Sequence, residues 1–185
     1  MKRLTERLDT LRELIKSAEF LEGKGLTGEV NIRIFCYDAK DEMTVRHFTK
    51  KLTADEKFPG RIIEYNLYRV FLSICDGKRI TEKIPALEKK NGTEELLRNL
   101  KNIAKNTVFV EKMKYEPHKV GDVILITGVG EAFPFIRVHS LLDAMQPHFS
   151  DVPILVMYPG TFDGHSLKLF DKLSPNSYYR AFKIV

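Results

Sequence analysis

Short apolar runs, bounded by glycine, proline or aspartate, recur along the chain and predict the strands of a sheet. Residues 123–126 are apolar at every position, which is typical of a strand buried on both faces of a parallel sheet. Residues 152–158 have the same character, and residues 30–37 and 61–67 are also predicted to be strands. Residues 178–185 carry charged side chains within their alternation, so we predict an edge strand there.

Between these runs, apolar residues recur every three or four positions, which predicts amphipathic helices. Helices are expected over residues 4–21, from residue 41 onward, over 67–75, over 134–145 and over 166–173. Pro134 is expected in the first turn of the fourth of these helices, because proline suits that position. Asp76 and Gly77 are predicted to form a turn.

The second and third predicted strands are separated by roughly fifty residues, which is long for a simple crossover. This segment is helical in pattern and rich in charge, so we predict a helical insert at about residues 78–115. The alternation of helices with buried strands predicts a Rossmann-like, three-layer α/β fold, in which helices cover both faces of a mostly parallel sheet. A single domain is expected to span residues 1–185.

The amino-acid composition excludes several classes of protein. The chain has 185 residues, of which 43% are hydrophobic and 30% charged, and this balance excludes a disordered tail. No apolar stretch is long enough to span a membrane, so we expect a soluble, cytoplasmic protein that does not bind membranes. The net charge of +5 permits contact with nucleic acid or with an acidic partner. Cys36 and Cys75 are too few for a disulfide framework and are expected to be buried.

In parallel sheets, ligands bind beyond the carboxyl ends of the strands, and three predicted turns leave those ends. If the strands are neighbours, polar side chains and glycines of these turns line one cleft. The candidate ligand-cleft residues are Asp38, Thr127, Gly128, Gly130, Arg137, His139, Gly160, Asp163 and His165.

The glycine turn after residues 123–126 matches no complete nucleotide-binding motif. A P-loop carries lysine after its second glycine, but Glu131 follows Gly130 here. A dinucleotide fingerprint needs a third glycine where Phe133 stands. Two interpretations remain, a tight turn that needs Gly128 and Gly130 for its backbone, or a degenerate nucleotide or phosphate site.

Two further pairs of titratable residues lie close together in the sequence. His139 and Asp143 are four residues apart on one predicted helix, which indicates a helical pair more than a metal site. His165 beside Asp163 forms an acid–base pair with Asp38 only if the turns meet, and Asp163 is first of all a turn residue. We therefore predict no catalytic residue, no metal site and no cofactor.

The helical insert is rich in lysine. A solvated helix face is one interpretation, and a surface for an acidic partner or for nucleic acid is the other. The candidate surface residues are Lys89, Lys90, Lys101, Lys105, Lys112 and Lys114.

Two segments rich in glycine and proline resemble the BrxB family of BREX bacteriophage-exclusion systems. They are residues 125–142, LITGVGEAFPFIRVHSLL, and residues 158–170, YPGTFDGHSLKLF, accompanied by residues 31–38 and 178–182. The resemblance covers almost the whole chain. It implies a cytoplasmic component of a phage-defence system, without an established catalytic motif, that binds the large phosphatase-like protein PglZ.

Three hypotheses follow. The first is a non-enzymatic component of a BREX system that acts through protein–protein interaction with PglZ. The second is a degenerate nucleotide- or phosphate-binding α/β protein. The third is an auxiliary DNA-contacting factor that uses the lysines of the insert, and here nucleic acid is a secondary partner.

Overall fold

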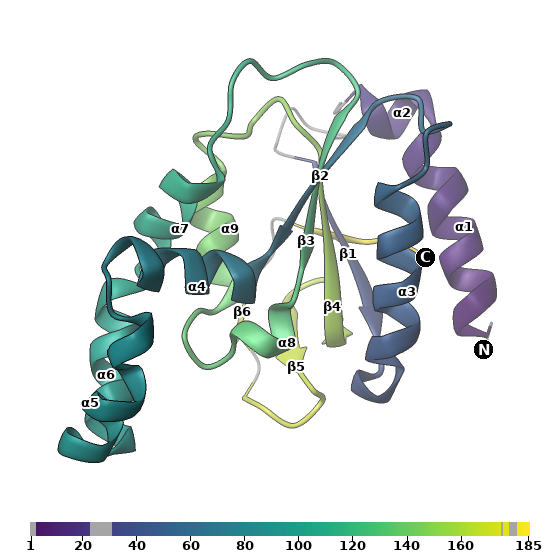
Figure 1. Ribbon diagram of the computed structural model, residues 1–185. Helices are drawn as coiled ribbons and strands as arrows, with labels where there is room; N and C mark the ends of the chain where they lie inside the picture. The colour runs from purple at the N-terminus through teal and green to yellow at the C-terminus, as the bar shows by residue number, and fades with distance from the viewer. Residues whose placement is uncertain (1–2, 23–30, 175, 178–180) are drawn as a thin grey trace.

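A parallel β-sheet forms the middle layer of the fold (Figure 1). This computed structural model describes residues 3–22, 31–174, 176–177 and 181–185. The central strands pair in the order β2-β3-β4-β1-β7, and all of these pairs are parallel. Their bounds are β1 Ile32–Tyr37, β2 Arg61–Asn66, β3 Asp122–Thr127, β4 Ile154–Phe162 and β7 Phe182–Lys183. Two short strands, β5 Ser166–Leu169 and β6 Asn176–Ser177, extend β4 as an antiparallel ribbon.

The inner strands are apolar because helices cover both of their faces. Every residue of β3 is buried, and so is all of β4 except Thr161. The pairing of Ile124 with Ile154 and of Ile34 with Val156 places aliphatic side chains side by side across three strands. The predicted strands and the three-layer α/β class are confirmed.

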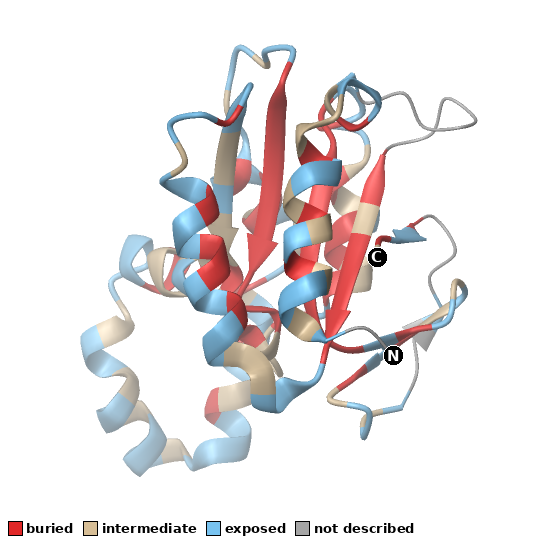
Figure 2. Cartoon of the chain, turned by 90° about the vertical axis from the view of Figure 1, so that its right-hand side faces the viewer, coloured by how far each residue is buried: buried red, intermediate tan, exposed pale blue. Residues whose placement is uncertain are grey.

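One face of the sheet, here the α3 face, is covered by α1 Leu4–Lys16 and α3 Glu42–Thr53, with α2 Ala18–Leu21 at one end (Figure 1). The two long helices bury aliphatic and aromatic side chains against the sheet, among them Leu11, Ile15 and Phe48. A short 3-10 helix, η1 Ala39–Asp41, joins β1 to α3. Figure 2 shows buried residues concentrated on the strands and on the helix sides that face them.

The opposite face, here the α4 face, is covered by α4, α7 and α9, with the single turn of α8 beside them. Their bounds are α4 Leu67–Gly77, α7 Asn106–Met113, α8 Val129–Ala132 and α9 Val138–Met145. None of the helices formed by the described residues combines the length and the apolar character needed to cross a membrane.

The segment between β2 and β3 is helical, as predicted. After α4 it forms η2 Thr81–Lys83, α5 Ile84–Asn91, α6 Thr93–Ile103 and α7. We call α5 and α6 the arm, because these two helices project from the sheet (Figure 1). No residue of α5 is buried, and α6 buries only Leu96 and Leu100. The last helix of the insert, α7, belongs instead to the core and buries Phe109, Val110 and Met113.

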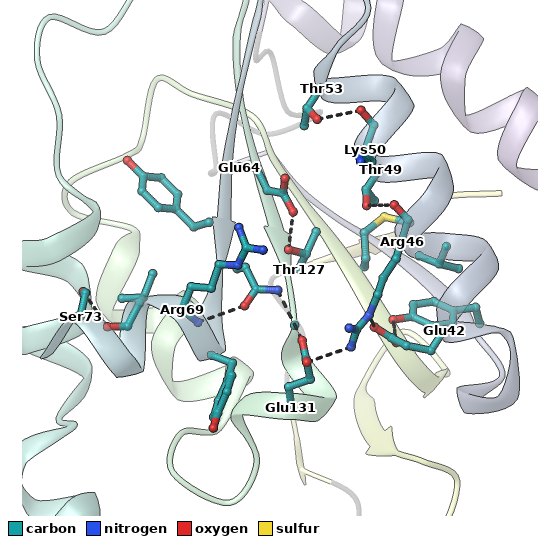
Figure 3. A pocket seen from close by; sticks show the side chains of 18 residues that line it. Glu42, Arg46, Thr49, Lys50, Thr53, Glu64, Arg69, Ser73, Thr127 and Glu131 are labelled. Atoms are coloured by element: carbon teal, nitrogen blue, oxygen red, sulfur yellow. Dashed lines mark hydrogen bonds and ion pairs between the residues drawn. The ribbon is translucent and has the colours of Figure 1, made fainter. Parts of the chain in front are cut away.

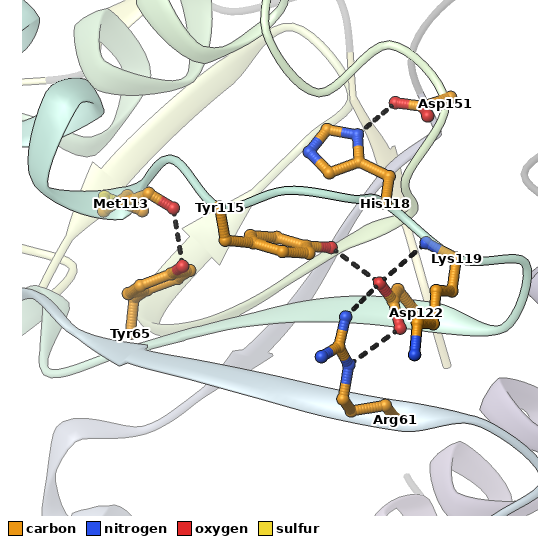
Figure 4. Close-up of polar contacts among 8 residues, drawn as sticks. All are labelled: Arg61, Tyr65, Met113, Tyr115, His118, Lys119, Asp122 and Asp151. Carbon is orange, nitrogen blue, oxygen red and sulfur yellow. Dashed lines mark hydrogen bonds and ion pairs between the residues drawn. The ribbon is translucent and has the colours of Figure 1, made fainter.

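A polar clamp ties the end of the insert to the sheet at the amino ends of β2 and β3 (Figure 4). The buried carboxylate of Asp122 accepts two hydrogen bonds from Arg61, at 3.0 and 2.7 Å. It also accepts from the Tyr115 hydroxyl at 3.1 Å and from the backbone N–H of Lys119 at 3.0 Å. Because Tyr115 and Lys119 follow α7, the clamp fixes where the chain re-enters the sheet.

Of the two elements predicted near the carboxyl terminus, the helix is wrong and the edge strand is confirmed in part. Residues 166–173 are not a helix, because Leu167 and Leu169 are buried while Lys168 between them is exposed. This period of two belongs to a strand, and β5 pairs with β4. The predicted edge strand 178–185 is confirmed as β7 over Phe182–Lys183, and residues 178–180 lie outside the described residues.

Two predicted helix boundaries are also wrong. Asp76 and Gly77 form no separate turn, because α4 continues to Gly77 and is capped at Lys78. Pro134 does not lie in the first turn of a helix, since α9 begins only at Val138. Phe133 is extended and ends α8, as expected for a residue that precedes proline.

Candidate functional site

A groove of about 650 Å³ opens on the α3 face, at the carboxyl ends of β2 and β3 (Figure 3). We call it the α3–β2 groove. Its charged and amide lining consists of Glu42, Arg46, Lys50, Glu64, Asn66, Arg69 and Glu131. The helical spacing of four residues places the first three on one side of α3, and the alternation of β2 places Glu64 and Asn66 on one face of the sheet.

One end of the groove is closed by a chain of charged side chains. The Arg46 guanidinium contacts Glu42 Oε1 at 2.8 Å and Glu131 Oε1 at 3.0 Å, which joins α3 to α8. The Tyr37 hydroxyl donates to Glu42 Oε2 at 2.6 Å. Burial, and then the hydrogen bond to Glu42, raises the pKa of Tyr37, so its hydroxyl remains a donor. The pKa of Arg46 is raised, first of all by its hydrogen bond to Glu42.

The floor of the groove is held by hydrogen bonds between β2, β3 and α4. Thr127 Oγ1 donates to Glu64 Oε1 at 2.7 Å. Asn66 caps α4, because its Oδ1 accepts from the backbone N–H of Arg69 at 3.0 Å, and its Nδ2 donates to Glu131 Oε2 at 3.4 Å. The outer strand, the helix start and the glycine turn after β3 are thereby fixed to one another.

The structure explains both glycines of the turn after β3 by close packing. Gly128 has φ of 68°, and a Cβ there would lie 2.6 Å from Asn66 Nδ2. A Cβ on Gly130 would lie 2.9 Å from Cε1 of Phe170. Beside the turn, Glu131 places a carboxylate where a phosphate-binding loop would carry lysine.

We expect the substitution Gly128→Ala to lower the free energy of unfolding by about 2 kcal/mol. The left-handed backbone and the loss of the Asn66 cap each cost about 1 kcal/mol. Urea unfolding of the single variants and of the double variant with Asn66→Ala measures the coupling. The Gly128→Ala effect should be smaller when residue 66 is alanine, and strictly additive effects would contradict this account.

The remaining candidate cleft residues are distributed over three other places. Asp38 and Gly160 line a second hollow of about 640 Å³, and Tyr37 lines both this hollow and the α3–β2 groove. Asp163 and His165 lie in the turn between β4 and β5, and His165 is exposed. Asp163 accepts the backbone N–H groups of His165 at 2.8 Å and of Ser166 at 2.7 Å, and these bonds lower its pKa.

Arg137 and His139 lie at the start of α9, outside both hollows. The guanidinium of Arg137 is 4.8 Å from the centre of the Phe133 ring. Burial, followed by the nearby Arg137 charge, lowers the pKa of His139. The structure therefore brings Thr127 and Gly128 together in the α3–β2 groove but places the other candidates elsewhere.

Both cysteines are buried and free, as expected. Burial raises the pKa of Cys36 to about 11, despite the opposing charges of Lys183 and Arg7. Across the described residues, no group of three or more His, Cys, Asp or Glu side chains is arranged to hold a metal ion.

Sequence reasoning missed most of the groove. Glu42, Arg46, Glu64 and Arg69 carry no motif, and the contact between Arg46 and Glu131 joins residues far apart in the chain. A weak signal was present in the spacing of Glu42, Arg46 and Lys50 on one predicted helix, next to a strand that ends in a capping asparagine.

The candidate lysines of the insert are all exposed. Lys89 and Lys90 lie in the last turn of α5, Lys101 lies on α6, and Lys105, Lys112 and Lys114 lie on or beside α7. Lys114 forms an ion pair with Glu111, and the other five form none with any of the described residues. Residues 78–115 contain ten Lys and Arg against five Asp and Glu, so their excess equals the net charge of the chain, +5.

The chain is similar to known proteins along its whole length. A family model described as BREX protein BrxB matches residues 63–184. A BREX protein BrxB of Bacillus cereus (strain H3081.97) is 35% identical, over 100% of this chain and 99% of that protein. A BREX protein BrxB of Escherichia coli O9:H4 (strain HS) is 30% identical, over 98% of this chain and 92% of that protein. No solved structure matches significantly. The chain therefore belongs to the BrxB family, whose members are components of BREX phage-defence systems.

Proposed function

We propose that this protein serves phage defence as a non-enzymatic component that binds another protein of its BREX system. The proposed partner is the phosphatase-like protein PglZ, and the proposed docking surface is the arm. Membership of the BrxB family supports the place in a BREX system. The docking role is supported by the shape and charge of the arm.

The exposure and charge of the arm are the observation that carries this proposal. No residue of α5 is fully buried, and only Ile84 and Leu87 pack, half-buried, against the core, so the other side chains of α5 remain accessible to a partner. The lysines of the insert repel one another in the free protein. An acidic partner surface would relieve that repulsion and would attract the arm during encounter.

The proposal predicts that the full chain co-elutes with the PglZ protein of its own locus in size-exclusion chromatography. Replacing Lys89, Lys90 and Lys101 together with glutamate should weaken this complex at least tenfold, or about 1.4 kcal/mol. The matched control replaces Lys51, Lys57 and Lys172, which are exposed on other parts of the fold, and should bind like wild type. A failure of wild-type protein to co-elute would contradict the proposal, and equal weakening by both triple variants would contradict the arm as its surface.

Auxiliary DNA contact is a second candidate, because the same lysines suit phosphate groups. It predicts binding that falls steeply with salt and that the arm variant loses. Absence of binding at low salt would exclude it.

A further inference from the structure

The outer strand β2 has an open backbone edge. Its pairing with β3 runs over all six residues, and the N–H of Arg61 donates to the carbonyl of Gly121 at 3.1 Å. Alternate residues of a parallel strand bond to the same side, so the N–H groups of Ile62 and Glu64 point away from β3. Nothing in the described part of the chain is hydrogen-bonded to these two N–H groups.

This edge lacks the protection that sheet edges usually have. At the other side of the sheet, β7 pairs through two residues only. In contrast, β2 is as long as its inner neighbour, contains no proline or lysine, and keeps a continuous register. Its two charged side chains are held by the fold, since Arg61 bonds to Asp122 (Figure 4) and Glu64 accepts from Thr127 (Figure 3).

Two cations near this edge that form no ion pair within the described chain favour an acidic occupant. Ile62 and Glu64 face the α3 side, and the α3–β2 groove continues past β2 to Tyr68 and Arg69 of α4. Arg46 is already paired with two carboxylates. Lys50 and Arg69 also line the groove, and neither forms an ion pair with a carboxylate of the described residues. These two cations are available to carboxylates of a bound chain.

We infer that the edge of β2 binds an extended acidic segment of another protein as an additional strand. Backbone hydrogen bonds to Ile62 and Glu64 supply the affinity, and alternate acidic side chains reach toward Lys50 and Arg69. This surface is separate from the arm and adds a second contact to the one proposed above.

The direct probe is a short fluorescent peptide of alternating glutamate and valine, compared with the same peptide carrying lysine for glutamate. Fluorescence anisotropy with the full chain at low salt should give at least tenfold tighter binding of the acidic peptide. The double variant Lys50→Glu, Arg69→Glu should lose this preference, and the triple arm variant should keep it. Absence of acidic-peptide binding, or equal binding of both peptides, would overturn the inference, whatever the result with PglZ.

A matched pair of substitutions tests the strand addition itself. Ile62→Pro removes an outward N–H but none of the amides that pair with β3, and Ile62→Ala shortens the side chain and keeps that N–H. We expect Ile62→Pro to weaken acidic-peptide binding at least tenfold relative to Ile62→Ala. If the proline variant does not fold, hydrogen exchange of wild type decides, because the Ile62 and Glu64 amides should exchange at least tenfold more slowly when peptide is bound. Equal binding by the two variants, or unchanged exchange, would contradict the inference.

Discussion

Replacing Gly160 with alanine is expected to lower the free energy of unfolding by about 3 kcal/mol. A Cβ at this position would lie 2.2 Å from the carbonyl oxygen of Lys168 and 3.0 Å from the backbone nitrogen of Phe170. Both atoms belong to the backbone, which cannot rotate away as a side chain can. Strands β4 and β5 must therefore move apart to make room for the methyl group. Such overpacking costs roughly 1–3 kcal/mol, and we expect the upper end of this range because both clashing atoms belong to the backbone.

Urea unfolding at neutral pH measures this effect, and Gly77→Ala is the matched control. A Cβ on Gly77, in the last turn of α4, would contact only Lys112 Nζ, at 3.7 Å. Alanine there should leave stability unchanged or raise it by up to about 1 kcal/mol, because alanine favours helix. A Gly160→Ala variant as stable as wild type would show that β4 and β5 do not pack as described.

Removing the carboxylate of the clamp is expected to have an effect of similar size. Asp122→Ala deprives Arg61, the Tyr115 hydroxyl and the Lys119 N–H of their shared acceptor, and should lower the free energy of unfolding by about 3 kcal/mol. Asp9→Ala is the control, because Asp9 is an exposed carboxylate of α1 that lies 4.0 Å from the Arg12 guanidinium. It should unfold at nearly the same urea concentration as wild type.

The clamp also predicts a pH dependence. Burial alone would raise the pKa of Asp122, but the bonds from Arg61, Lys119 and Tyr115 outweigh it and hold this pKa below its usual value. Its contribution is fully present above the unfolded pKa of about 3.9 and is lost as pH falls through the lower folded pKa. In Arg61→Ala the buried carboxylate loses its cation and its pKa rises, so the variant should be destabilised most at pH 7 and progressively less toward pH 4.5. A destabilisation that grows between pH 7 and pH 4.5 would contradict this assignment.

The fold could largely be predicted because its main elements have clear periods. Residues 123–126 are apolar at every position, and the inner strand β3 is buried throughout. The segment 166–173 is too short for its sequence to distinguish the period of a strand from that of a helix. Its strand conformation depends on pairing with β4, which is a long-range contact. The start of α9 was predicted too early, because Pro134 was expected in the first helical turn. In the structure Pro134 follows the extended residue Phe133, and α9 begins at Val138.

The candidate site was less predictable, because strand order and long-range pairs are not local properties. The prediction of one cleft assumed that three turns meet, but the order β2-β3-β4-β1-β7 leaves Thr127 and Asp163 in different surroundings. The groove instead depends on the packing of α3 against the outer strand β2. Its defining contact, between Arg46 of α3 and Glu131 of α8, forms only when the two helices lie side by side in the folded protein.

Site-specific photo-cross-linking in the assembled BREX complex tests the central claim, that the arm docks PglZ. A photoreactive amino acid placed at Lys90, at the end of α5, should give a covalent adduct with PglZ after irradiation. The same amino acid at Lys172, exposed after β5, should give none. An adduct at Lys172 with none at Lys90, or no adduct with PglZ at either position, would contradict the account.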